Sequence, residues 1–171
     1  GVGKTTLARL VYNDDLAQNF DLKAWVCVTD VFDLENITKA ILNSVLNSDA
    51  SGSLDFQQVQ RKLTDTLAGK TFLLVIDDVW NENCGHWDLL RAPFSVGSKG
   101  SKVIVTTRNK NVALMMGAAK NVHELNPLSE DACWSVSQKH AFEHRNINDH
   151  PNLVSIGRKI VGKCGGLPLA L

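Results

Sequence analysis

The chain has 171 residues, of which 44% are hydrophobic and 21% are charged, an ordinary composition for one globular domain or for one domain and part of a second. Its 18 Lys and Arg residues balance 18 Asp and Glu residues, so no net field would attract nucleic acid or an anionic membrane surface. The sequence has no run of about 18 apolar residues, the length that a membrane-spanning helix needs, so a transmembrane class is not indicated either.

The first half of the chain alternates helical patterns with one apolar run. Residues 1–6, GVGKTT, lead into a segment with helical periodicity directly after Lys4. AWVCV at 24–28 predicts a strand, and Asp33 can then cap a second helix through its carboxylate. A third helix is predicted at 56–67, where apolar residues lie on one stripe.

The middle of the chain holds three more predicted strands. TFLLVIDD at 71–78 is an apolar or β-branched run that ends in two acids, a pattern typical of a strand buried on both faces. KVIVTTR at 102–108 repeats this form with a terminal arginine, and NVHEL at 121–125 is a weaker example. Strands that alternate with helices predict an α/β fold built on a parallel sheet.

The tail of the chain has a different character from the rest. Ser129 can cap a helix that runs to Phe142, and Pro151 can open another. Because this tail reads as wholly helical, the sequence predicts a boundary near residue 126. An α/β domain would occupy residues 1–125, and residues 126–171 would begin a small all-α subdomain.

The four cysteines are scattered and form no C-x-x-C pair. This distribution favours reduced thiols in a cytosolic protein over a disulfide or zinc framework. The cysteines are Cys27, Cys84, Cys133 and Cys164.

The opening hexapeptide matches the second half of the phosphate-loop pattern G-x-x-x-x-G-K-[ST]. The first glycine of that pattern would lie before Gly1, so the sequence predicts a chain that begins inside the loop. The Lys4 ammonium can neutralise β- and γ-phosphate oxygens, and the Thr5 hydroxyl can ligate Mg²⁺. Backbone N–H groups at the start of the helix supply further donors to phosphate. These donors belong to Gly1, Val2, Gly3, Lys4, Thr5 and Thr6.

Three charged side chains follow the two strongest strands after the loop. Ligands of open parallel sheets bind at the carboxyl ends of the strands, so these side chains should meet the phosphate loop there. Asp77 would hold the Mg²⁺ ion through water, and Asp78 would orient an attacking water. An aspartate reaches less far than a glutamate, which favours slow hydrolysis. Arg108 would contact the γ-phosphate for catalysis or sensing, or else form a surface ion pair.

These motifs leave several functions open. A P-loop kinase or a metabolic ATPase would use the same loop, although neither a substrate lid nor a second arginine cluster is evident. A GTPase usually reads guanine with N-K-x-D, and the nearest string, NKNV at 109–112, lacks the acid, which favours adenine. A scaffold that retains ADP without hydrolysing ATP is a further alternative.

Six segments in chain order together span nearly the whole sequence. They are GVGKTT (1–6), FDLKAWVCVTD (20–30), LLVIDDVW (73–80), GSKVIVTTR (100–108), HELNPLSEDACW (123–134) and GGLPLA (165–170). This ordered set resembles that of plant NB-ARC disease-resistance proteins. Trp80 and the WVCVTD form of the second segment resemble the coiled-coil class rather than the TIR class. SVSQKHAF at 135–142 departs from the family pattern, which commonly has an apolar pair after the tryptophan.

The resemblance implies a nucleotide-operated switch that binds ADP at rest, exchanges it for ATP and then forms a homo-oligomer to signal defence. Lys4, Thr5 and Thr6 would contact the phosphates, and Asp77 would serve Mg²⁺. The family's sheet is five-stranded and parallel, and its strand before the phosphate loop lies near the middle. Without that strand, residues 1–171 alone are expected not to fold stably.

The resemblance also assigns the remaining site residues. Asp78 would assist hydrolysis, Arg108 would sense the γ-phosphate, and Pro168 of GGLPLA would pack near the adenine. Residues 126–171 would begin the helical ARC1 subdomain of an intracellular receptor. Its expected partners are the adenine nucleotide and the other parts of the same receptor, namely a coiled coil, the remaining ARC subdomains and leucine-rich repeats.

Overall fold

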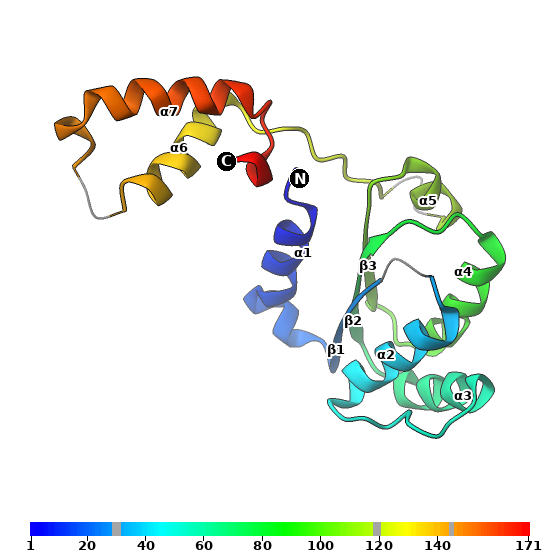
Figure 1. Ribbon diagram of the computed structural model, residues 1–171. Helices are drawn as coiled ribbons and strands as arrows, with labels where there is room; N and C mark the ends of the chain where they lie inside the picture. The colour runs from blue at the N-terminus through cyan, green and yellow to red at the C-terminus, as the bar shows by residue number, and fades with distance from the viewer. Residues whose placement is uncertain (29–31, 118–120, 144–145) are drawn as a thin grey trace. The chain divides into compact units, whose positions relative to one another are not determined.

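The chain contains two compact units. The computed structural model describes residues 1–28, 32–117, 121–143 and 146–171 (Figure 1). The sheet unit comprises Thr5–Val122, and the helical unit comprises Gly1–Lys4 together with His123–Leu171. Thr29 and Asp30, which close the second family-like motif, lie outside the described residues.

A three-stranded parallel sheet organises the sheet unit. Its strands are β1 (Leu22–Cys27), β2 (Phe72–Val79) and β3 (Lys102–Thr107), and they lie in the order β1-β2-β3. The strands predicted from the sequence at 24–28 and at 102–108 are therefore confirmed, as is the central strand with its terminal acids. Together with the flanking helices, the parallel sheet confirms the predicted α/β fold class.

Seven α-helices accompany the strands in the part of the chain that is described. They are α1 (Lys4–Asn13), α2 (Leu34–Leu46), α3 (Phe56–Leu67), α4 (Cys84–Arg91), α5 (Lys110–Met115), α6 (Glu130–Ala141) and α7 (Pro151–Lys163). Short 3-10 helices are η1 (Asp15–Asn19), η2 (Ala92–Val96), η3 (Ile147–Asp149) and η4 (Pro168–Ala170). The predicted caps are confirmed, because the Asp33 carboxylate accepts the Asn36 N–H at 3.0 Å and the Ser129 hydroxyl accepts the Ala132 N–H at 3.2 Å.

Two parts of the sequence prediction need correction. Residues 121–125 form no strand, because this extended segment has no hydrogen-bonded strand beside it among the described residues. Its two apolar residues, Val122 and Leu125, are three positions apart and do not alternate, and a strand also needs a hydrogen-bonded partner. Helix α4 was not predicted. Its eight residues give too few turns for a clear period, although the Asn83 side chain caps it.

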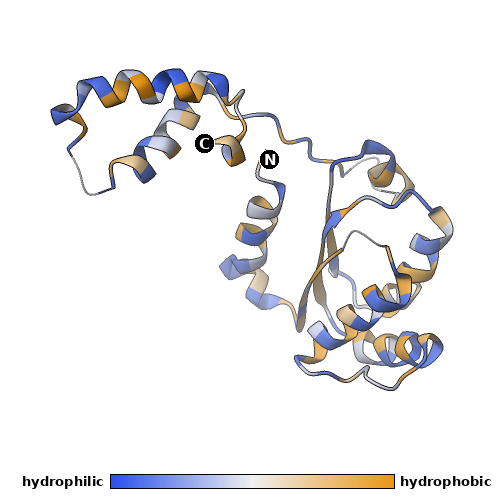
Figure 2. Ribbon diagram, in the orientation of Figure 1, coloured by the Kyte–Doolittle hydropathy of each residue, from blue (hydrophilic) through white to orange (hydrophobic). Residues whose placement is uncertain are grey.

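The hydrophobic core lies between the sheet and the helices α2, α3 and α4. The side chains of Leu74 and Ile76 in β2 are buried in this core, as are Ile41 and Leu63 of the covering helices. Figure 2 shows mainly hydrophobic residues along the strands. Burial of each such side chain contributes about 1.5–3 kcal/mol, so this layer fixes the position of β2 and of the acids at its end.

The helical unit has a smaller core built from α6 and α7. Cys133, Trp134 and Val161 are buried in it. The Arg158 guanidinium lies 5.1 Å from the centre of the Trp134 ring, a cation–π distance. Beyond α7, the carbonyl of Gly166 accepts the Leu128 N–H at 2.8 Å, so this hydrogen bond links the two ends of the helix pair.

Replacing Gly166 with alanine is expected to destabilise the helical unit. Gly166 has φ of +76°, and an added Cβ would lie 2.5 Å from the Leu128 carbonyl oxygen. The left-handed backbone alone costs a residue with a Cβ about 1–2 kcal/mol. We expect faster hydrogen–deuterium exchange in α6 and α7. Gly162→Ala is the matched control, because its nearest neighbour is 4.0 Å away and alanine favours a helix. Equal exchange in the two variants would contradict this prediction.

Candidate functional site

Strand β2 ends in an irregularity that changes where its two acids point. The pairing register with β3 shifts between Ile76 and Val79, and Asp78 adopts φ of 57° in the left-handed region. Consecutive residues of a regular strand point to opposite faces, whereas a bulge re-aims a side chain. A non-glycine residue at positive φ is uncommon and costs backbone energy, which makes this strand end a candidate functional site.

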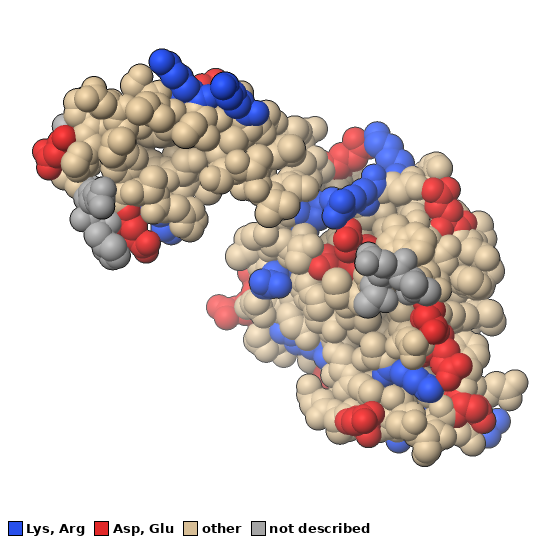
Figure 3. Space-filling view, in the orientation of Figure 1, with Lys and Arg blue, Asp and Glu red and all other residues tan. Residues whose placement is uncertain are grey.

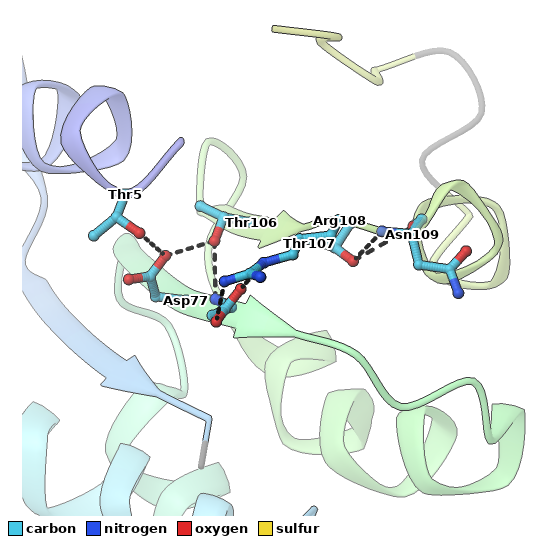
Figure 4. Close-up of polar contacts among 7 residues, drawn as sticks. Thr5, Asp77, Thr106, Thr107, Arg108 and Asn109 are labelled. Atoms are coloured by element: carbon cyan, nitrogen blue, oxygen red, sulfur yellow. Dashed lines mark hydrogen bonds and ion pairs between the residues drawn. The ribbon is translucent and has the colours of Figure 1, made fainter. Parts of the chain in front are cut away.

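The carboxylate of Asp77 accepts two hydroxyl hydrogen bonds on one oxygen. Thr5 Oγ1 donates to Asp77 Oδ1 at 3.0 Å, and Thr106 Oγ1 donates to the same oxygen at 2.5 Å (Figure 4). Asp77 is 4% exposed, so this carboxylate is buried. The structure therefore brings Thr5 of α1 and Asp77 of β2 together, although they lie 72 residues apart in sequence.

The second acid pairs with the arginine that follows β3. Arg108 Nε lies 3.4 Å from Asp78 Oδ1, and Arg108 Nη2 lies 3.5 Å from Asp78 Oδ2. The two side chains are 77% and 48% exposed, so water screens this ion pair. Such a pair is weak, so the Arg108 guanidinium can leave Asp78 for an anion that carries more charge.

The backbone of the opening hexapeptide also suits an anion site. Gly3 has φ of +98°, a conformation that favours glycine, and α1 begins at the next residue, Lys4. Helix N-termini present N–H groups to phosphate. Gly1, Val2 and Lys4 belong to the helical unit by their contacts, as does Pro168 at the start of η4. Thr6 follows in α1 with an exposed side chain.

Sequence reasoning missed Thr106, which the structure places beside both acids. Its hydroxyl oxygen accepts the Asp78 N–H at 2.9 Å while donating to Asp77. The only signal for it was its place two residues before Arg108 in the strand-ending string TTR. Which threonine faces the acids depends on the strand register, and the sequence pattern does not fix that register.

The loop after β3 is held by its own hydrogen bonds. The Asn109 N–H donates to Thr107 Oγ1 at 3.0 Å, and the Asn109 side chain caps α5 by accepting the Asn111 N–H at 2.9 Å. The Asn109 amide also donates to the Glu82 carboxylate, which connects this loop to the segment after β2. These bonds flank Arg108 and restrain the backbone that carries it.

Charge at this strand end affects a neighbouring thiol. Cys27 at the end of β1 lies opposite Asp77 in the strand register. Burial raises the pKa of the Cys27 thiol above its ordinary value, and the negative charges of Asp77 and Asp78 raise that pKa further. Cys27 is exposed to reagents nonetheless.

Alkylation of Cys27 is expected to report this charge. The thiolate is the reactive form, so a raised pKa moves the rate–pH midpoint to higher pH and slows alkylation at pH about 8. Asp78→Asn removes one of the charges, so we expect the midpoint to fall and alkylation to quicken. Mass spectrometry of the Cys27 peptide measures both. Asp88→Asn is the control, because that carboxylate pairs with Arg91 on α4. A midpoint that Asp78→Asn leaves unchanged would refute the electrostatic contribution.

The donor set fits Mg²⁺ bound together with a phosphate ligand. Thr5 and Asp77 offer a hydroxyl and a carboxylate oxygen, the hard ligands that Mg²⁺ prefers. The described residues contain no group of three or more His, Cys, Asp or Glu side chains that could hold a metal. A site with so few protein ligands suits Mg²⁺, which usually keeps several waters and takes other ligands from substrate phosphates.

These features define a P-loop NTPase-like protein: a parallel sheet, a glycine-lysine turn that opens a helix, and a strand-end acid bonded to the threonine after the lysine. A sequence model of the NB-ARC domain matches residues 1–147. The chain therefore belongs to the NB-ARC domain family.

Plant disease resistance proteins are among the relatives that share this sequence. Disease resistance protein RGA2 of Solanum bulbocastanum is 45% identical over 172 residues, which cover 99% of this chain and 17% of that protein. Disease resistance RPP13-like protein 4 and disease resistance protein RPP8, both of Arabidopsis thaliana, are 38% and 32% identical over all of this chain and over 20% and 19% of their own lengths. The chain thus spans about a fifth or less of these relatives.

Within the described ranges, every helix is too short or too polar to cross a bilayer. On the face of the sheet unit drawn in Figure 3, acidic and basic side chains are interspersed rather than separated by sign.

Proposed function

We propose that this chain is the nucleotide-binding part of a plant immune receptor that acts in the cytoplasm as an ADP/ATP switch. The receptor would hold ADP at rest, exchange it for ATP on activation, and hydrolyse ATP slowly. The observation that carries the proposal is the 3.0 Å hydrogen bond between Thr5 and Asp77 in a chain of the NB-ARC family. That bond joins the two residues expected to hold Mg²⁺, the threonine of the phosphate loop and the aspartate at the end of β2.

The phosphate end of the nucleotide would be bound by the start of α1. Lys4 would neutralise β- and γ-phosphate oxygens, and the N–H groups of residues 1–6 would donate to the same oxygens. Thr5 and Asp77 would hold Mg²⁺, which supplies positive charge to the phosphate oxygens when it is bound. Asp77 already lies within hydrogen-bond distance of Thr5, so β2 would not need to move for Asp77 to take this role.

The ion pair between Asp78 and Arg108 would respond to the γ-phosphate. A phosphate carries more charge than a carboxylate, so the γ-phosphate of ATP can draw Arg108 away from Asp78. The freed Asp78 carboxylate could then accept a hydrogen bond from the attacking water. ADP has no γ-phosphate and would leave the pair intact. The exposure of both side chains favours this exchange, because little desolvation energy holds them together.

The adenine end would involve the helical unit. Pro168 opens η4, and we propose that its ring packs near the base. A domain at residues 1–125 that grips phosphate and an ARC1 segment at 126–171 that touches adenine could rotate on nucleotide exchange. The partners of this switch would be the coiled coil, the remaining ARC subdomains and the leucine-rich repeats of the same receptor, with homo-oligomers forming after activation.

Turnover of bound ATP separates this function from its alternatives. In the full-length receptor that we propose contains this chain, a single load of labelled ATP should convert slowly to ADP that stays bound. Typical enzymes turn over at about 1–10³ per second, and we expect a far lower rate. Rapid turnover with product release would favour a metabolic or regulatory ATPase or kinase. Stable ATP with no conversion would favour a scaffold that only retains nucleotide.

A further inference from the structure

Thr106 contacts both acids of β2 through a single hydroxyl group. Its Oγ1 donates to Asp77 Oδ1 at 2.5 Å and accepts the Asp78 N–H at 2.9 Å. Thr106 is 7% exposed and Asp77 is 4% exposed, so both lie away from solvent. Figure 4 shows Thr5 and Thr106 directed at the Asp77 carboxylate from different elements, α1 and β3.

The hydroxyl replaces a backbone interaction that the strand irregularity disrupts. In a regular parallel pair, the N–H groups of β2 would bond to carbonyls of a neighbouring strand. The register of β2 and β3 slips at Asp78, whose N–H bonds instead to the Thr106 side chain. A buried N–H without a partner would cost about 1–3 kcal/mol. Thr106 therefore supports the positive φ of Asp78.

The same hydroxyl orients the Asp77 carboxylate. Two donors on Oδ1, one from Thr5 and one from Thr106, fix the rotation of the carboxylate group. If Thr5 and Asp77 held Mg²⁺, the Thr5 hydroxyl could supply a lone pair to the ion and still donate its proton to Asp77, because a hydroxyl has one O–H and two lone pairs. Thr106 would be the donor to Asp77 that has no part in holding the ion, and it would keep the carboxylate in place from the side of β3. Partners that orient a ligand in this way typically change metal affinity about 10- to 100-fold.

We propose that Thr106 is a positioning residue that sets the Mg²⁺ dependence of nucleotide binding by holding Asp77 and the Asp78 backbone. The assignment rests on the proposed function, because it concerns the same phosphate site. It adds a residue of β3 whose hydroxyl acts through Asp77 and Asp78 and touches neither nucleotide nor metal. Valine has the same shape and lacks the hydroxyl, whereas serine retains the hydroxyl and lacks the methyl group.

The test compares Thr106→Val and Thr106→Ser in the full-length receptor. ADP affinity is titrated at increasing Mg²⁺ concentration, and the ratio of affinities with and without Mg²⁺ is the readout. We expect Thr106→Val to reduce that ratio at least about tenfold and Thr106→Ser to retain it within about twofold. Thr38→Val is the matched control, since Thr38 is a fully buried threonine that donates to the Leu34 carbonyl at 2.7 Å within α2.

A second readout needs no nucleotide. Hydrogen–deuterium exchange is measured in a peptide that covers residues 72–79. The Asp78 amide should exchange faster in Thr106→Val and should stay protected in Thr106→Ser. Equal Mg²⁺ ratios in all variants, with nucleotide still bound, would overturn the role of Thr106 alone. Failure of the unmodified receptor to bind any nucleotide would overturn the proposed function, and the Mg²⁺ role of Thr106 with it. An equal loss of the Mg²⁺ affinity ratio in Thr106→Val and Thr106→Ser would also contradict a role for the hydroxyl.

Discussion

Replacing Lys4 with alanine should abolish nucleotide retention by the full-length receptor. Removing one partner of a hydrogen-bonded charge pair costs about 2–5 kcal/mol, which raises Kd about 30-fold to several thousand-fold. Lys4 stands at the first position of α1, directly after a glycine with positive φ. No neighbouring lysine in the 1–6 hexapeptide could replace its charge. Titration with a fluorescent ADP analogue would measure the change.

The control for this prediction is a second lysine, which carries the same charge and lies outside the opening hexapeptide. Lys99 is exposed in the turn before β3, so Lys99→Ala should bind ADP as the unmodified receptor does. Circular dichroism of both variants would show whether the fold is kept. Wild-type affinity in a folded Lys4→Ala receptor would contradict a phosphate role for the opening hexapeptide.

Replacing Asp77 with asparagine should remove the Mg²⁺ dependence of nucleotide binding. Asparagine keeps the shape and one oxygen that can accept from Thr5 and Thr106, but it loses the negative charge that attracts the ion. We expect affinity for Mg²⁺-bound ADP to fall about 100-fold, or about 3 kcal/mol, within the range for losing one partner of a charged pair. Affinity without Mg²⁺ should stay equal or rise, because a carboxylate no longer repels the phosphates.

This opposite behaviour separates loss of a ligand from misfolding. A misfolded variant would lose affinity under both conditions. Asp88→Asn is the matched control, since the Asp88 side chain is 65% exposed and pairs with Arg91 on the same helix. An Asp77→Asn receptor that keeps its full response to Mg²⁺ would refute the assignment of Asp77 as a metal ligand.

The sequence predicted those elements that strong local signals mark, such as an apolar run or a helix cap. The uninterrupted apolar run before Asp77 could only be a buried strand or a helix segment, and its acids marked where it ends. Asp33 and Ser129 predicted helix starts because short polar side chains cap N–H groups. The meeting of Thr5 with Asp77 followed from the rule that parallel strands present their carboxyl ends at one edge.

Other features depend on register and on partners, which no local pattern encodes. The irregularity at Asp78 and the bonds of Thr106 arise because β2 and β3 slip by one position, and a slip of this size changes every side-chain contact near it. Residues 121–125 have no neighbouring strand among the described residues, so the strand expected there does not form. The ion pair between Asp78 and Arg108 matches the surface alternative that the sequence left open.

The most direct test of the account is to identify the nucleotide that the protein carries. The purified full-length receptor would be denatured, and the released nucleotides would be separated and quantified against protein concentration. We expect near-stoichiometric ADP, which would agree with a switch resting in its ADP state. Guanine nucleotide, or no nucleotide from a folded receptor, would contradict the proposal that Thr5 and Asp77 form part of an adenine-nucleotide site.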